Sequence, residues 1–169
     1  MFVLGIDPGL SRCGYAVVER AARGARARAI GVIRTSASAP LPARLVELQT
    51  ELRELLVEAR PDVVAVERVF FQVNVRTAMA VGQASGIAMA EAHRAGCAVV
   101  EYTPTQVKQA VAGDGRADKE AIGHMVQTLL GLGAVPRPAD AADAAALALC
   151  HLAHAPVRER AAATAGARR

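Results

Sequence analysis

The chain begins with the stretch that decides its fold, Phe2-Val3-Leu4-Gly5-Ile6-Asp7-Pro8-Gly9. The nearly unbroken apolar run predicts a strand that is buried on both faces, and Pro8-Gly9 turns the chain at its end. Asp7 therefore stands at the C-terminal tip of a central strand. Two interpretations of this carboxylate stay open at this point: it caps the turn, or it is a rigidly held first ligand for a hard cation.

Length and composition bound the class of protein. With 169 residues, of which 53% are hydrophobic, the chain is long enough for one globular domain with a proper core. We expect this domain over residues 1–155 and a basic, disordered tail over residues 156–169, which is rich in Arg and Ala and has no apolar pattern. No apolar run could span a bilayer and no signal peptide is recognisable, so we expect a cytoplasmic protein without a membrane partner.

Charge and cysteine content narrow the chemistry. The net charge of +4 and the pI near 9.4 permit nucleic-acid binding, and the aromatic content of 3% favours electrostatic contact over base stacking. Cys13, Cys97 and Cys150 are odd in number and lack the CxxC spacing of a zinc site. They are expected to be reduced, buried thiols.

The apolar patterns after the first strand predict an α/β fold. Two further strands follow at residues 13–19 and 29–35, and the arginine-rich stretch at 20–28 is expected to be a solvated turn. The remaining elements are expected to be a helix from 40 to 61, a strand at 62–67, a helix at 74–95, a strand at 98–102, and helices at 105–112, 118–130 and 140–154. This order corresponds to a mixed five-stranded sheet flanked by helices, in which the first three strands are antiparallel and the last two are parallel to the first. In the helix at 74–95, Gly82 and Gly86 share a face that allows close packing, on the sheet in the preferred interpretation or on a second subunit.

Three further acids occupy positions comparable to that of Asp7. Glu67 ends the apolar strand at 62–67, so both carboxylates lie at the C-terminal ends of parallel strands, where open α/β sheets place their sites. Asp140 and Asp143 are three residues apart at the start of an apolar helix, which puts them about 60° apart on one face. Each has a simpler explanation: Glu67 is an exposed strand end, and the two aspartates favour the helix dipole.

Together the four carboxylates predict a metal-dependent phosphodiesterase. An oxygen-only ligand set without a Cys/His cluster favours Mg²⁺, with Mn²⁺ able to substitute. Two such ions about 4 Å apart would activate a water and stabilise the leaving oxygen of a phosphodiester. His151 and His154 are interpreted as packing or surface residues, although His151 could face the same side as Asp140 and Asp143.

Six short motifs follow one another along the chain: Gly5-Ile6-Asp7-Pro8-Gly9, Gly14-Tyr15, Val66-Glu67-Arg68-Val69-Phe70, Gly82-Gln83-Ala84-Ser85-Gly86, Val107-Lys108-Gln109 and Ala139-Asp140-Ala141-Ala142-Asp143-Ala144. Each motif is weakly specific by itself. In this order and at these separations, they resemble the RuvC family of bacterial Holliday-junction resolvases, the crossover junction endodeoxyribonucleases. The resemblance extends from residue 2 to residue 152 without a large gap.

The resemblance implies a ribonuclease-H-like fold, which agrees with the strand order above, and a homodimer that binds four-way DNA junctions in recombination and repair. Such an enzyme would nick two strands of like polarity symmetrically and leave 5′-phosphate and 3′-hydroxyl ends. The metal-binding catalytic acids would then be Asp7, Glu67, Asp140 and Asp143. The resemblance also implies a branch-migration complex of RuvA- and RuvB-family proteins as a further partner.

Several other residues are candidates for DNA contact. The resemblance puts Lys119, as a catalytic residue, near the scissile phosphate and Lys108 on the DNA-binding face. It gives Phe70 a stacking role at the junction centre, and the neighbouring Phe71 could wedge the junction instead. Three arginines in predicted loops or at helix starts near the acidic strand ends suit phosphate contact, namely Arg12, Arg76 and Arg116. Each basic residue could equally be a solvated surface charge, and Phe70 a core residue.

Three alternative functions stay open. A ribonuclease-H-like nuclease that acts on RNA would share the acids, but not the loop of Phe70 and Phe71 with Lys108 and Lys119. An actin-like or sugar-kinase-type nucleotide-binding protein begins with a similar glycine-flanked aspartate, but it uses two such domains, whereas this chain has one. A non-enzymatic binder of branched DNA would be expected to lack one or more of the acids.

Overall fold

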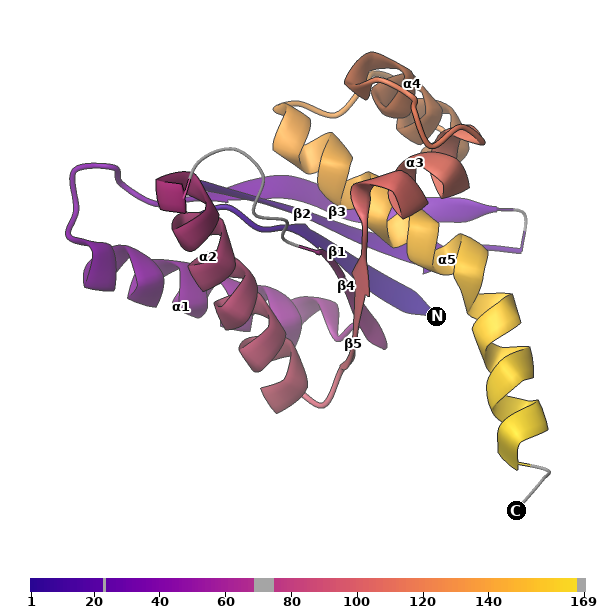
Figure 1. The fold of residues 1–169 in the computed structure, drawn as a ribbon, viewed down its shortest axis with the longest axis horizontal. Helices are drawn as coiled ribbons and strands as arrows, with labels where there is room; N and C mark the ends of the chain where they lie inside the picture. Colours follow the sequence, from indigo (N-terminus) through magenta and orange to yellow (C-terminus); the bar gives the residue numbers. More distant parts are fainter. Residues whose placement is uncertain (23, 69–74, 167–169) are drawn as a thin grey trace.

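The computed structural model contains one five-stranded sheet with helices on both faces (Figure 1). It describes the backbone of residues 1–22, 24–68 and 75–166, and the side chains of the same residues apart from 75–77 and 156–166. The strands are β1 (Phe2–Asp7), β2 (Arg12–Arg20), β3 (Ala25–Arg34), β4 (Val63–Glu67) and β5 (Ala98–Tyr102).

The sheet has the strand order β3-β2-β1-β4-β5, so the N-terminal strand lies at its centre. β1 is antiparallel to β2, and β2 is antiparallel to β3. On its other side β1 is parallel to β4, which is parallel to β5. The mixed sheet predicted from the sequence is therefore confirmed.

The turn between β2 and β3 is shorter than the sequence predicts. β3 begins at Ala25 and not at residue 29, so the prediction of a solvated turn over residues 20–28 is wrong for most of its length. Alanine and arginine alternate from Ala25 to Arg28, with the arginines exposed and the alanines half-buried. A period of two is the pattern of a strand with one solvated face. Arg28 also forms an ion pair with Glu19 of β2, with 2.8 Å between Nη2 and Oε2.

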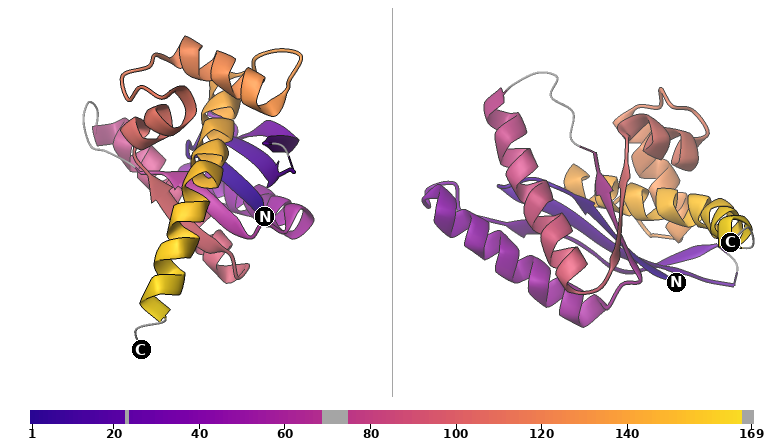
Figure 2. Two further views of the ribbon diagram at one scale, coloured as in Figure 1. Left: turned by 90° about the vertical axis from the view of Figure 1, so that its right-hand side faces the viewer. Right: turned by 60° about the horizontal axis from the view of Figure 1, so that its bottom comes forward.

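Two helices, α1 (Leu41–Ala59) and α2 (Val75–Arg94), cover one face of the sheet (Figure 2). The apolar stripe of α1 is buried against this face through Leu48, Leu52 and Leu56. On α2 the structure differs from the preferred interpretation of Gly82 and Gly86, because both are exposed and neither has a neighbour within 4 Å of an added Cβ. The prediction that these two glycines pack on the sheet is therefore wrong. Their face of α2 is turned to solvent.

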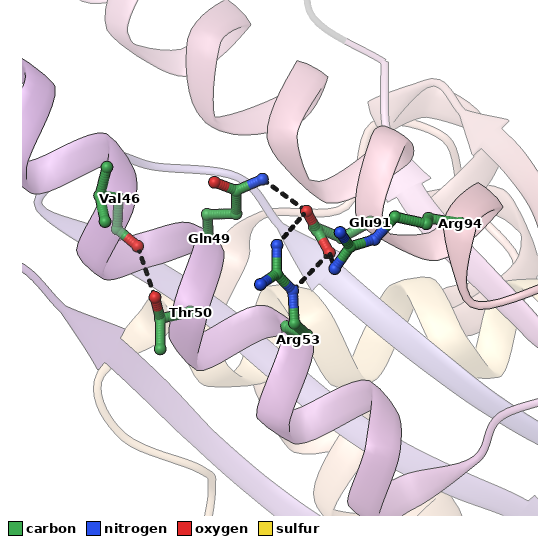
Figure 3. Close-up of polar contacts among 6 residues, drawn as sticks. All are labelled: Val46, Gln49, Thr50, Arg53, Glu91 and Arg94. Atoms are coloured by element: carbon green, nitrogen blue, oxygen red, sulfur yellow. Dashed lines mark hydrogen bonds and ion pairs between the residues drawn. The ribbon is translucent and has the colours of Figure 1, made fainter.

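A buried carboxylate joins the two helices of this face (Figure 3). Glu91 of α2 is only 4% exposed and accepts hydrogen bonds from Gln49 Nε2 at 2.6 Å and from Arg53 Nε and Nη2 at 3.2 Å, both on α1. Arg94 Nη2 donates to it at 2.7 Å. These donors lower the pKa of Glu91, and the hydrogen bond from Arg53 is the largest cause. The contacts hold α2 in a defined position against α1.

Three helices, α3 (Pro104–Ala112), α4 (Lys119–Leu130) and α5 (Ala139–Gly166), lie on the opposite face (Figures 1 and 2). α5 crosses the strands directly, and its residues from Ala144 to Cys150 are all buried. Asp118 caps the N-terminus of α4, as the sequence predicts, by accepting a hydrogen bond from the Ala121 N–H at 2.8 Å. α3 and α4 pack on α5, so that this helix lies between them and the sheet.

The last helix is longer than the sequence predicts. Its predicted end is residue 154, whereas the helical backbone continues to Gly166 and projects beyond the rest of the molecule (Figure 2). Alanine and arginine are strong helix formers, so the composition favours a helix even without an apolar stripe. The division at residue 155 and the disordered tail expected over residues 156–169 both stay predictions. Across the described ranges, no helix has both the length and the apolar character needed to cross a membrane.

Candidate active site

Asp7 and Glu67 end two neighbouring strands at the centre of the sheet. β1 and β4 are parallel, with Ile6 opposite Val66, so the next residue of each strand is an acid. Ile6 and Val66 are buried in the core formed with α1 and α2. Because side chains alternate along a strand, Asp7 and Glu67 point to the opposite face, where α5 lies. Both are half-buried there.

The first turn of α5 brings Asp140 and Asp143 to the same strand ends. Gly14 of β2 is paired with Asp7 of β1. Gly14 lies so close to α5 that a Cβ there would overlap the carbonyl oxygen of Asp140 and lie 2.5 Å from its carbonyl carbon. The start of α5 therefore rests on the residue beside Asp7. The two aspartates are partly buried, with 22% of the Asp140 side chain and 28% of the Asp143 side chain exposed.

Burial and neighbouring charges change the protonation of the two strand acids, Asp7 and Glu67. Burial raises the pKa of Asp7 to about 7, the charges of Glu67, Asp143 and Asp140 add to the rise, and Lys119 opposes it. Burial is also the largest cause of the raised pKa of Glu67, and Asp143 is the next. Like charges at short range disfavour ionisation unless a proton or a cation compensates them. The four acids therefore form a group that favours binding of positive charge near neutral pH.

Two basic side chains flank the acids of α5. Lys119, the first residue of α4, donates a hydrogen bond from Nζ to Asp143 Oδ2 at 2.8 Å, and this contact is the largest cause of its raised pKa. Arg12, the first residue of β2, has Nε 3.1 Å from Asp140 Oδ2. More than half of each basic side chain is exposed. Both cations are therefore accessible to a phosphate that approaches the acids.

The donor set fits a hard divalent cation. Asp140 Oδ2 is buried and accepts no hydrogen bond from the described residues, because Arg12 Nε is close enough for an ion pair but is not aligned to donate. Carboxylate oxygens are the ligands that Mg²⁺ prefers. As they are oriented, no three His, Cys, Asp or Glu side chains in the described part of the chain converge closely enough to chelate an ion. Binding one ion would therefore require some of the four carboxylates to rotate, which the partial exposure of Asp140 and Asp143 permits.

The remaining predicted site residues lie elsewhere or are not described. Lys108 is half-buried on α3, and Arg116 is exposed in the loop before α4, beside an open groove. Phe70 and Phe71 lie outside the described residues, and so does the side chain of Arg76. The predicted residues that the structure brings together are Asp7, Glu67, Asp140, Asp143, Lys119 and Arg12.

The C-terminal part of α5 contributes packing residues. His151 is only 4% exposed, and its Nδ1 lies 3.0 Å from the hydroxyl oxygen of Tyr102 in the core. His154 donates from Nδ1 to the carbonyl oxygen of Cys150 at 2.8 Å. The interpretation of His151 as a packing residue is therefore confirmed. All three cysteines are free and buried, as the sequence predicts.

Two features of the site are missing from the sequence-based prediction. One is the ion pair of Arg12 with Asp140, which joins residues far apart in the chain and has no local signal. The other is the close approach of α5 to Gly5 and Gly14. Here a signal exists, because glycine inside a strand often marks a place where another backbone comes near.

Comparisons with known protein sequences yield matches over nearly the whole chain. The family model "Crossover junction endodeoxyribonuclease RuvC" matches residues 3–151. The crossover junction endodeoxyribonuclease RuvC of Streptomyces avermitilis is 55% identical over 161 residues, which cover 95% of this chain and 92% of that protein. The protein of the same name from Frankia alni is 53% identical over 169 residues, covering 99% of this chain and 85% of that protein.

Solved structures of RuvC proteins also match this chain. Thermus thermophilus RuvC is 41% identical and superposes with a TM-score of 0.85, covering 93% of this chain and 96% of that chain. T. thermophilus RuvC in complex with a Holliday junction substrate is 39% identical, with the same TM-score and coverage. The yeast mitochondrial Holliday junction resolvase Ydc2, at 16% identity and a TM-score of 0.66, shares the fold. The ribonuclease-H-like fold implied by the resemblance is therefore confirmed.

Proposed function

The chain belongs to the RuvC family of crossover junction endodeoxyribonucleases, and from this premise we propose that it resolves four-way DNA junctions at a metal site formed by Asp7, Glu67, Asp140 and Asp143. One observation carries the proposal. Carboxylates from two strand ends and one helix act on one another at the same end of the sheet: the pKa of Asp7 rises to about 7, with burial as the largest cause and the charges of the other three acids next. Metal-dependent phosphodiesterases need such a concentration of oxygen ligands.

The proposed reaction is hydrolysis of a phosphodiester bond that leaves 5′-phosphate and 3′-hydroxyl ends. Mg²⁺, or Mn²⁺ in its place, with two ions per site, would supply an activated water and compensate the charge of the leaving oxygen. Asp7 and Glu67 offer ligands from rigid strand ends, and Asp140 and Asp143 offer ligands from the first turn of α5. Lys119 lies 2.8 Å from Asp143, so its ammonium can bind a phosphate oxygen at the edge of the acids and stabilise charge on the scissile group.

Two observations support a four-way junction as the substrate. The structure of T. thermophilus RuvC in complex with a Holliday junction substrate covers 93% of this chain, at 39% sequence identity. The net charge of +4 favours contact with the phosphate backbone. The proposed phosphate contacts are Arg12, Arg76, Lys108, Arg116 and Lys119. Phe70 or Phe71 is proposed to stack at the junction centre.

A homodimer is the proposed assembly, because symmetric nicking of two strands requires two equivalent sites. The exposed face of α2 supports it: Met79 is 59% exposed, and Gly82, Gly86 and Ala90 follow on the same side of the helix. Small residues at this spacing let a second helix come close. A branch-migration complex of RuvA- and RuvB-family proteins is a further proposed partner, and the bacterial origin of the relatives favours action in the cytoplasm.

The decisive experiment incubates the purified protein with a synthetic four-way junction in Mg²⁺ or Mn²⁺. A linear DNA duplex and an RNA–DNA hybrid of matched sequence serve as substrate controls. We expect metal-dependent conversion of the junction into nicked duplexes. Asp7→Asn should abolish cutting and leave junction binding intact, whereas Glu51→Gln, which removes an exposed carboxylate on α1, should cut like the wild type.

Each other outcome points to a different conclusion. Undiminished cutting by Asp7→Asn would contradict the proposed site. Equal cutting of the linear duplex would exclude junction specificity. Preferential cutting of the hybrid would favour a nuclease that acts on RNA, and nucleotide hydrolysis without DNA cutting would favour the actin-like alternative.

A further inference from the structure

α5 touches the sheet backbone to backbone at two glycines. At Gly5 of β1, an added Cβ would overlap the carbonyl oxygen of Ala144 and lie 2.9 Å from the nitrogen of Ala148. At Gly14 of β2, it would overlap the carbonyl oxygen of Asp140 and lie 2.5 Å from its carbonyl carbon. Ordinary Cβ contacts begin at 3.4 Å. Neither position can therefore carry a side chain unless α5 moves.

The obstacle at both glycines is helix backbone, which cannot rotate away as a side chain can. Gly31 of β3 is a useful contrast, because a Cβ there would meet the ring of Tyr15 at 2.6 Å. Tyr15 packs with the core on the opposite face, under α1 and α2. A side chain at Gly31 would therefore displace the Tyr15 ring without pushing on α5.

The height of α5 above the sheet controls the geometry of the acidic site. Asp7 and Glu67 belong to the strands, whereas Asp140 and Asp143 belong to the helix. Gly14 is paired with Asp7 and lies directly beneath the backbone of Asp140. The separation between the two pairs of acids is thus set where the helix and strand backbones meet.

We propose that Gly5 and Gly14 are positioning residues for the metal site: their missing side chains let α5 lie low enough for its acids to share ions with the strand acids. This inference rests on the proposed metal-dependent cleavage. A methyl group at Gly14 must move the Asp140 carbonyl carbon from 2.5 Å to at least 3.4 Å, a displacement of about 1 Å. A misplacement of that size costs on the order of 100-fold in rate.

The identity of the metal provides a readout that general destabilisation does not change. Mg²⁺ demands near-ideal octahedral geometry at short ligand distances. Mn²⁺ is larger and accepts longer, less regular coordination by the same oxygen ligands. Lifting α5 should therefore impair cleavage in Mg²⁺ more than cleavage in Mn²⁺.

The test measures single-turnover junction cleavage by Gly14→Ala and Gly5→Ala over a range of Mg²⁺ and Mn²⁺ concentrations. Thermal unfolding and junction binding are recorded on the same samples. We expect folded variants that bind the junction as the wild type does, cut about 100-fold more slowly in Mg²⁺ and recover about tenfold in Mn²⁺. Gly31→Ala should unfold at a lower temperature but keep the wild-type metal preference. Gly133→Ala, where an added Cβ meets nothing within 4 Å, should match the wild type in both respects.

A folded Gly14→Ala protein that cuts at the wild-type rate in Mg²⁺ would overturn the inference. So would an equal loss in both metals. If Gly14→Ala does not fold, Ala141→Val is tested by the same two criteria. Ala141 is 1% exposed in the first turn of α5, and the added methyl groups crowd the contact between α5 and Gly14 from the helix side. Metal-independent cutting by the wild type would contradict the proposed function itself, and this outcome is distinct from any behaviour of the glycine variants.

Discussion

Replacement of Asp7 by Asn is expected to stabilise the metal-free protein although it abolishes cleavage. The pKa of the Asp7 carboxyl is raised from 3.8 to about 7 in the folded protein, first by burial and then by Glu67, Asp143 and Asp140. The ionised form of Asp7 is therefore unfavourable in the fold at physiological pH. Asparagine has nearly the same shape without the charge, so Asp7→Asn removes this cost.

The sign and size of the effect follow from linkage. The folded protein holds the Asp7 proton more tightly than the unfolded chain, so the destabilising contribution is absent below pH 3.8, grows up to about pH 7 and is complete above it. A pKa difference of one unit corresponds to about 1.4 kcal/mol. The rise in the pKa of Asp7 from 3.8 to about 7 therefore lowers the free energy of unfolding above pH 7 by at most about 4 kcal/mol. For a domain of this size, each kcal/mol moves the Tm by about 2–4 °C, so the full effect would raise the Tm of the variant at pH 8 by about 8–16 °C.

Thermal unfolding of both proteins in EDTA, from about pH 4 to pH 8.5, measures this difference directly. The gap in Tm should be small at the acidic end, widen up to about pH 7 and then stay constant. Mg²⁺ should raise the Tm of the wild type more than that of Asp7→Asn, because a bound cation compensates the carboxylates. Glu51→Gln should give a Tm difference that does not change with pH. An Asp7→Asn protein less stable than the wild type at pH 8, or a gap without pH dependence, would refute the raised pKa of Asp7 on which this prediction rests.

Three further substitutions test other parts of the structure. Lys119→Ala should slow single-turnover cleavage about 100-fold and weaken junction binding far less, because the ammonium beside Asp143 acts on the scissile phosphate; an unchanged rate would exclude that role. Glu91→Gln should lower the free energy of unfolding in urea by about 1–3 kcal/mol by weakening the contacts between α1 and α2, and stability equal to the wild type would show that these contacts contribute nothing. Tyr102→Phe should cost about 1 kcal/mol in the same assay through loss of the hydrogen bond with His151, with cleavage unaffected; a large loss of cleavage would instead connect this pair to the site.

The strand order could be predicted because its signals are local. A buried strand and an amphipathic helix each reveal themselves within a few residues, and a β-helix-β crossover makes two strands parallel. That reasoning put Asp7 and Glu67 at equivalent ends of parallel strands, and the structure makes those strands neighbours. The helix period likewise put Asp140 and Asp143 on one face.

Other elements could not be predicted from local patterns. The start of β3 was hidden because its alternating alanines and arginines have the composition of a basic turn, and only pairing with β2 identifies it as a strand. For α2, the sequence shows that Gly82 and Gly86 share a face but not which face meets the sheet. The structure buries the opposite side, including Ala84 and Ala88, and leaves the glycines exposed.

The stretch from Phe2 to Gly9 thus determined by itself that a buried central strand ends in an acid, and the later patterns determined which other acids belong with it. Only the tertiary structure decided how close those acids come. The pKa of Asp7 and the ion pair of Arg12 with Asp140 depend on distances between β1, β2 and α5. These distances are set where Gly5 and Gly14 meet the backbone of α5. The sequence determines which chemical group each residue carries, whereas the distance between two groups depends on how two elements pack together.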